Sequence, residues 1–311
     1  MNRRHTPEQV AAWRRDGALV IPEFFTPDEV AAVVADFDRV FGALKASAAE
    51  APTVTRRPDQ VGAFNVDQFK NLQSVPLDCS PALNLIGVHP ALLALAREAL
   101  ESDDVHCYQL QAWAKFTGGA DYDQPFHCDY VNHTLTAPSE DERRNSLTII
   151  CYFTDVTEAH GPTHYVTKPD SDPIAGPEGT LTPGNALSRR LAPLARSTAS
   201  KAGSIFPYGI DVYHRGTNLT APGAHRYTVT TCFKRGGNDA IGFHAWAFHH
   251  TKPWARIFDH ATPEQLACFG VPLPGHPFWT EVTLARTQTR FPNWNAAPYR
   301  AALAGGERAA A

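Results

Sequence analysis

The spacing of apolar residues in this 311-residue chain changes near residue 105, and this change constrains the fold more than any other feature. Residues 105–116, "VHCYQLQAWAKF", alternate with a period of two, which is typical of a β-strand. One predicted face carries Gln109, Gln111, Trp113 and Lys115, and the other carries Tyr108, Leu110, Ala112 and Phe116. Polar side chains along one face of a strand indicate that this face lines a wet cavity.

Further segments with strand composition follow, namely "SLTIICYFTDV", "GSIFPYGIDVYH" and "HRYTVTTCFKR". Loops connect these segments, without the regular helices that parallel sheets require. This pattern is typical of an antiparallel barrel or jelly roll.

The flanks of this region are predicted to be helical. "TPEQVAAWRRDG", "TPDEVAAVVADFDRVF" and "TPEQLACFG" each begin with a capping Thr, a Pro at the first helical position and Glu or Gln three residues after the Thr. A further helix is predicted over residues 90–100, "PALLALAREAL". The end, "AALAGGERAAA", is predicted to fray.

The sequence therefore predicts a mainly β fold. We expect a double-stranded β-helix, a jelly-roll or cupin-like core, with N-terminal and C-terminal helical segments. The prediction treats residues 1–311 as a single domain, with helical support at 1–104, the core at 105–235 and a helical or lid region at 236–311. Within the core, residues 168–200 are rich in Pro, Gly and Ser and are interpreted as a lid or mobile loop.

Bulk properties exclude several classes of function. The net charge of −4 is not the basic footprint of a nucleic-acid-binding protein. We find no apolar run of the roughly 18 residues needed to span a membrane and no signal-peptide pattern. The six cysteines show no C-x-x-C spacing, so we interpret them as reduced thiols in a cytoplasmic protein.

The segment "QPFHCDYVN" places His127 and Asp129 two residues apart. Such a pair is either an ion pair or two ligands of one metal. On a strand both side chains point the same way, and His214 in "DVYHRGTN" is the best third ligand. Two histidines and one carboxylate form the facial set that holds non-haem Fe(II) and leaves positions open. His133 is the closest rival ligand.

Arg226 lies twelve residues after His214, at the start of the next predicted strand. A planar and permanently charged guanidinium is the preferred partner for the far carboxylate of a metal-chelating 2-oxo acid. We therefore expect a hairpin that carries the metal ligand and this clamp on adjacent strands.

The chain resembles the phytanoyl-CoA dioxygenase family of Fe(II)/2-oxoglutarate-dependent oxygenases. Four stretches between residues 5 and 235 carry the resemblance: "TPEQVAAWRRDGALVIPEFFTPDEV", "FHCDY", "FTDVTEAHGPTHYV" and "HRGTNLTAPGAHRYTVTTCF". The resemblance implies Fe(II) on His127, Asp129 and His214, and 2-oxoglutarate on Arg226. It suggests that Gln111, Lys115 and Thr148 also contact the cofactor. The family often has Ser two residues past the distal His; here Gly216 stands there and Thr217 follows, so the resemblance makes Thr217 the candidate for this hydroxyl contact to the cofactor.

The function expected from this resemblance is hydroxylation of a small organic substrate by O₂, with release of succinate and CO₂. Desaturation, cyclisation or epimerisation would use the same residues and stay open, as does a non-catalytic jelly-roll protein that binds a metal or ligand. Asp129 argues against halogenation, because halogenating relatives lack the carboxylate. The sequence indicates neither the substrate nor the oligomeric state. Four C-terminal aromatic residues, Phe278, Trp279, Phe291 and Trp294, are better explained by packing than by a lid.

Overall fold

The computed structural model describes residues 3–49, 69, 71–118, 123–134, 138–139, 141–175, 185–238, 240–241, 253–276 and 279–309. Within these residues the strands form a five-stranded sheet, ordered β1-β2-β8-β3-β6, and a three-stranded sheet, ordered β5-β4-β7. The strands are β1 (Leu72–Ser74), β2 (Val105–Phe116), β3 (Leu147–Tyr152), β4 (Thr163–Tyr165), β5 (Arg196–Ser197), β6 (Ile205–Gly209), β7 (His214–Gly216) and β8 (His225–Arg235). Every strand pair is antiparallel. The predicted mainly β fold is confirmed.

The described helices are α1 (Pro7–Asp16), α2 (Pro27–Ala49), α3 (Pro81–Ile86), α4 (Pro90–Leu100), α5 (Tyr130–His133), α6 (Lys168–Ala175), α7 (Asn185–Leu191), α8 (Ala255–Phe258), α9 (Pro263–Cys268), α10 (Glu281–Arg290) and α11 (Ala297–Ala309). The predicted helix starts are confirmed: Thr6 and Thr262 form capping boxes, and Thr26 exchanges hydrogen bonds with Glu29. Gly17 ends α1 at φ 77°, a conformation that glycine adopts without strain.

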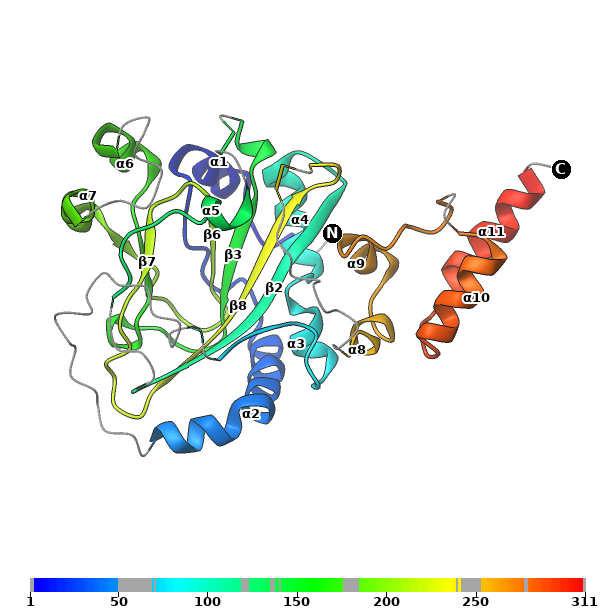
Figure 1. The fold of residues 1–311 in the computed structure, drawn as a ribbon, viewed down its shortest axis with the longest axis horizontal. Helices are drawn as coiled ribbons and strands as arrows, with labels where there is room; N and C mark the ends of the chain where they lie inside the picture. The colour runs from blue at the N-terminus through cyan, green and yellow to red at the C-terminus, as the bar shows by residue number, and fades with distance from the viewer. Residues whose placement is uncertain are drawn as a thin grey trace.

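One face of the five-stranded sheet is covered by helices. Helices α2, α4 and α9 pack on β2, and α4 also contacts β8 and β3 (Figure 1). Leu110 and Ala112 of β2 and Val229 of β8 point into this core. The alternate residues of the same strands face the other way, toward a cavity. The register of β2 shifts between Cys107 and Gln109, so Tyr108 leaves the face of Leu110 predicted from simple alternation and joins a second cluster.

The 168–200 segment is more ordered than predicted. It contains α6, α7, a 3-10 turn (Ala192–Leu194) and β5, while residues 176–184 lie outside the described residues. Proline-rich composition suggested a loop, but Pro169 lies in the first turn of α6, where its missing N–H costs nothing.

The C-terminal tail forms helix α11 to Ala309, so the prediction of a frayed end is wrong. Figure 1 shows α10 and α11 beyond α8 and α9, on the side away from β7. Trp279, Phe291 and Trp294 are buried in the main core cluster, which confirms packing as their role. Phe278 lies outside the described residues.

The stretch Pro81–Leu100 has a mean hydropathy of 1.2 over a window that is 67% buried. It is the one described stretch long and apolar enough to pass as a membrane span, but it comprises α3 and α4, whose apolar side chains pack in the core. All six cysteines are buried and none forms a disulfide.

Candidate active site

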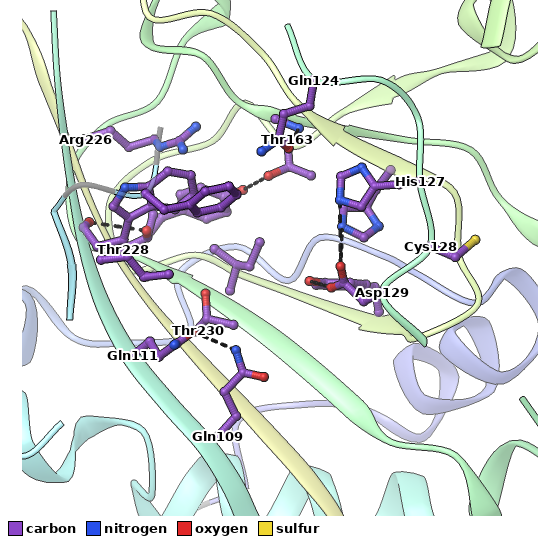
Figure 2. A pocket seen from close by; sticks show the side chains of 18 of the residues that line it. Gln109, Gln111, Gln124, His127, Cys128, Asp129, Thr163, Arg226, Thr228 and Thr230 are labelled. Carbon is purple, nitrogen blue, oxygen red and sulfur yellow. Dashed lines mark hydrogen bonds and ion pairs between the residues drawn. The ribbon is translucent and has the colours of Figure 1, made fainter. Parts of the chain in front are cut away.

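A cavity of about 450 Å³ lies between the two sheets. Its walls come from alternate residues of β2, β3 and β8 on one side, and from β7 and the segment around His127 on the other. Figure 2 shows Arg226, Thr228 and Thr230 on one wall, with His127 and Asp129 opposite. A cavity of this size accommodates one or two small organic molecules.

The structure brings His127, Asp129 and His214 together. Their potential ligand atoms all lie within 4.8 Å of one another. Asp129 Oδ1 lies 3.7 Å from His127 Nε2 and 3.6 Å from His214 Nε2. Ligands at ~2.1 Å from one metal in adjacent octahedral positions are about 3 Å apart, so a small closure of these three groups would complete a metal site.

Both histidines direct their Nε2 atoms toward Asp129 Oδ1. His127 Nδ1 lies 2.9 Å from the Pro125 carbonyl oxygen, and His214 Nδ1 lies 3.0 Å from that of Val212. Because a carbonyl oxygen only accepts, each Nδ1 carries a proton, and in the neutral form of each ring the lone pair is therefore on Nε2, where it can bind a metal. Burial, aided by the neighbouring His214, lowers the pKa of His127 to about 4, so this imidazole is neutral at physiological pH.

The backbone at this point differs from the predicted strand. His127 forms an isolated antiparallel bridge with His214, but Asp129 already has helical dihedrals, φ −78° and ψ −13°, just before α5. The carboxylate reaches the imidazoles through this turn and not through strand alternation.

Asp129 is held as a carboxylate. Burial opposes its ionisation, but the attraction of His214, His127 and His133 and a hydrogen bond from Tyr208 together lower its pKa to about 2. The Tyr208 hydroxyl donates to Asp129 Oδ2 at 2.8 Å. The site therefore offers one oxygen and two nitrogen donors in the protonation states that metal binding requires.

Arg226 occupies the opposite wall of the cavity (Figure 2). Its side chain is only 3% exposed, and its Nε and Nη1 atoms are buried without a hydrogen-bond partner among the described residues. Its guanidinium carbon lies 5.4 Å from the centre of the Trp113 ring. Burial lowers the pKa of Arg226, which shows that the charge is held at a cost in free energy. A buried cation with unsatisfied N–H groups fits an anionic ligand such as a carboxylate.

The predicted hairpin geometry is wrong in one respect. His214 lies on β7 of the three-stranded sheet, whereas Arg226 lies on β8 of the five-stranded sheet. His214 and the Arg226 guanidinium therefore face each other across the cavity instead of lying on neighbouring strands.

Of the other predicted cofactor residues, only Gln111 lines the cavity. Lys115 is buried and its Nζ donates to the Thr217 carbonyl at 3.0 Å. The Thr217 hydroxyl donates to the Pro162 carbonyl at 2.6 Å, and the Thr148 hydroxyl accepts from Cys232 Sγ at 3.5 Å. These three contacts join neighbouring segments behind the cavity wall.

Several lining residues were missed from the sequence. Thr228 and Thr230 follow Arg226 at intervals of two on β8, and this alternation was a usable signal. Gln124 also lines the cavity, and its Oε1 accepts from the Gly216 N–H at 2.8 Å. Tyr208 lies on β6, 79 residues from Asp129 in the chain, and no spacing rule could have paired them.

His133, the rival ligand, also lines the cavity but lies outside the three-residue cluster. Its Nδ1 lies 2.6 Å from the Tyr108 hydroxyl, which itself donates to Ser146. The Tyr108 hydroxyl therefore accepts from His133 Nδ1–H.

Comparisons with known proteins identify the family and agree with the fold. The family model "Phytanoyl-CoA dioxygenase (PhyH)" matches residues 13–174, slightly more than half of the chain, so the chain belongs to this family. An ectoine dioxygenase from Bordetella parapertussis is 27% identical over 157 residues, which cover 50% of this chain and 46% of that protein. The chain thus matches less than half the length of this relative.

Two solved structures with a similar fold come from nogalamycin biosynthesis. The epimerase SnoN of nogalamycin biosynthesis, in complex with Fe³⁺, alpha ketoglutarate and nogalamycin RO, matches with a TM-score of 0.52 and 17% identity. The match covers 73% of this chain and 82% of SnoN. The carbocyclase SnoK matches with a TM-score of 0.51 and 17% identity, over 74% of this chain and 83% of SnoK. These similarities confirm the fold that the sequence predicts.

Proposed function

We propose that this protein is an Fe(II)- and 2-oxoglutarate-dependent dioxygenase that hydroxylates a small organic substrate with O₂ and releases succinate and CO₂. One observation carries the proposal. The His127, Asp129 and His214 cluster shares a cavity with a buried guanidinium whose N–H groups lack partners. Each feature has an ordinary structural explanation alone, but together they match the needs of a metal and a dicarboxylate.

Each residue has a stated role in this proposal. His127 Nε2, His214 Nε2 and Asp129 Oδ1 hold the metal. Arg226 binds the distal carboxylate of 2-oxoglutarate, and Gln111 and Gln124 offer amide groups to the bound ligands from the same cavity. When bound, Fe(II) and 2-oxoglutarate would supply the electrons that activate O₂ for oxidation of the substrate. We assign no cofactor contact to Lys115, Thr148 or Thr217, because none of the three lines the cavity.

In this proposal the protein positions the ligands and excludes water from the cavity. The apolar and aromatic walls, including Trp113, Tyr152 and Ile150, keep the site dry while the polar groups orient the ligands. The epimerase and carbocyclase of the same fold have other outcomes, so the mass of the product decides between them. Hydroxylation adds one oxygen atom, desaturation or oxidative cyclisation removes two hydrogens, and epimerisation leaves the mass unchanged. A cytoplasmic location stays a prediction that the buried, free cysteines support.

The test is anaerobic addition of 2-oxoglutarate to the Fe(II)-loaded protein. Chelation of the metal by the 2-oxo acid produces a visible charge-transfer band, and admission of O₂ then produces succinate. We expect both in the wild-type protein and neither in Asp129→Ala. A wild-type protein that gives no band under saturating Fe(II) and 2-oxoglutarate would instead be the non-catalytic binding protein.

A further inference from the structure

We propose that Tyr208 is a positioning residue that restricts Asp129 to one metal-binding oxygen and so keeps a coordination position open. The inference rests on the proposed function. The two oxygens of Asp129 have different neighbours: Oδ1 lies 3.7 and 3.6 Å from the two imidazole Nε2 atoms, while Oδ2 accepts the Tyr208 hydroxyl at 2.8 Å. One oxygen therefore faces the metal position and the other is already engaged.

Tyr208 is fixed in place from several sides. It lies on β6, in register with Thr148 of β3, and Ala18 bridges to its other side. Its ring stacks on Phe206, with centroids 5.0 Å apart, and lies 4.7 Å from the His214 ring. The residue is 3% exposed. Its hydroxyl cannot swing away without disturbing this packing, so the bond to Oδ2 is a rigid restraint.

Asp129 needs such a restraint because of its own backbone. It lies in the turn before the four-residue helix α5, outside the strands. Its side chain makes no capping hydrogen bond to this helix that would fix its rotamer. Because Tyr208 is fixed in the five-stranded sheet, its hydrogen bond also fixes the position of the Asp129 carboxylate. Outer hydrogen-bond partners of ligating carboxylates orient them in this way in other metal sites.

The hydrogen bond from Tyr208 should affect how many further ligands a bound metal can accept. The facial set leaves three coordination positions, two for the chelating 2-oxo acid and one for O₂. If Oδ2 were released, the carboxylate could bind through both oxygens and occupy the last of these positions. Removing the Tyr208 hydroxyl should therefore impair binding of a diatomic ligand more than binding of metal or 2-oxoglutarate.

The test is Tyr208→Phe, which removes the hydroxyl and keeps the ring. The matched control is Tyr227→Phe, because the Tyr227 hydroxyl donates to Asp38 at 2.9 Å, a bond of the same kind outside the cavity. Nitric oxide serves as the diatomic probe, added anaerobically to the Fe(II)- and 2-oxoglutarate-loaded proteins. Electron paramagnetic resonance of the nitrosyl complex gives its affinity, and isothermal titration gives the affinities for Fe(II) and 2-oxoglutarate.

We expect Tyr208→Phe to bind Fe(II) and 2-oxoglutarate and to lose about tenfold or more in nitric oxide affinity, by analogy with the roughly 10- to 100-fold cost in metal affinity or activity of removing an outer partner of a metal ligand. The control variant should match the wild type in all three. A nitric oxide affinity of Tyr208→Phe within twofold of wild type overturns the inference. Loss of Fe(II) binding by Tyr208→Phe also overturns it, since the tyrosine would then build the site instead of directing one oxygen. If the wild-type protein binds no Fe(II), the proposed function itself fails.

Discussion

Replacing Arg226 with Met should make the ligand-free protein more stable while destroying its affinity for 2-oxoglutarate. The Arg226 side chain is 3% exposed and two of its nitrogens lack partners, so the folded state holds a poorly compensated charge. Removing such a charge saves several kcal/mol of desolvation, and loss of the contact with the Trp113 ring costs ~2 kcal/mol. The expected net gain in unfolding free energy is about 1–3 kcal/mol.

The same change removes the anchor for the dicarboxylate. Two charge-assisted hydrogen bonds contribute about 1.5–3 kcal/mol each, so 2-oxoglutarate affinity should fall by a factor of roughly 100 to 20,000. Denaturant unfolding with Mn²⁺ present, with and without 2-oxoglutarate, measures both effects. At a hundredfold excess over the wild-type Kd, 2-oxoglutarate should stabilise the wild type by ~2.7 kcal/mol and the variant by ~0.4 kcal/mol or less.

Arg235→Met is the matched control on the same strand. Arg235 is satisfied, because its Nε donates to the Leu100 carbonyl at 2.6 Å and its Nη2 to that of Glu101 at 3.1 Å. Its replacement should destabilise the protein and leave the 2-oxoglutarate response intact. An Arg226→Met protein that is less stable than wild type without ligand, or that gains as much stability from 2-oxoglutarate as the wild type does, would refute the reasoning.

Three further outcomes are expected. Asp129→Ala should abolish Fe(II)-dependent turnover with an unchanged circular dichroism spectrum, and turnover at the wild-type rate would remove Asp129 from the ligand set. Gly216→Ala should raise the KM for 2-oxoglutarate or substrate, because its Cβ would lie 2.9 Å from Gln124 Oε1; an unchanged KM would show that Gln124 plays no part. Burial opposes the ionisation of Glu29, but Arg4 and its other partners lower its pKa to about 2. Because this pKa is depressed on folding, Glu29→Gln should cost about 1–2 kcal/mol in urea unfolding at pH 7, a difference that shrinks as the pH falls from 4.5 toward 2. A pH-independent difference would contradict this assignment.

The elements of the fold that depend on local chemistry were predictable from the sequence. The Thr-Pro-x-Gln/Glu starts specify helix caps within four residues, and the alternation of β2 specifies its two faces. The bulge at Cys107/Gln109 was not predictable, because it depends on pairing with β8, more than 120 residues away. The helices α6, α7 and α11 were also not predicted. Their sequences contain residues that favour turns, and composition does not show the packing that stabilises short helices.

The candidate site also contains residues that the sequence predicted and residues that it did not. Short-range patterns pointed to His127, Asp129, His214 and Arg226, because each of these residue types has a chemistry that few others supply. The structure places all four around one cavity. Lys115 was indistinguishable from a lining residue by alternation alone, but the end of β2 lies beyond the cavity and its amine reaches a carbonyl instead.

The residues of the candidate site come from both sheets. The histidine ligands meet through the bridge between His127 and His214, which belongs to the side of the three-stranded sheet, while Arg226 projects from the centre of the five-stranded sheet. A dicarboxylate that chelates the metal at one end and pairs with Arg226 at the other therefore spans both sheets. Tyr208 lies on the edge strand β6, and its hydrogen bond to Asp129 links the larger sheet to one of the proposed metal ligands. The same tyrosine that restricts the carboxylate thus also holds the two halves of the site in register.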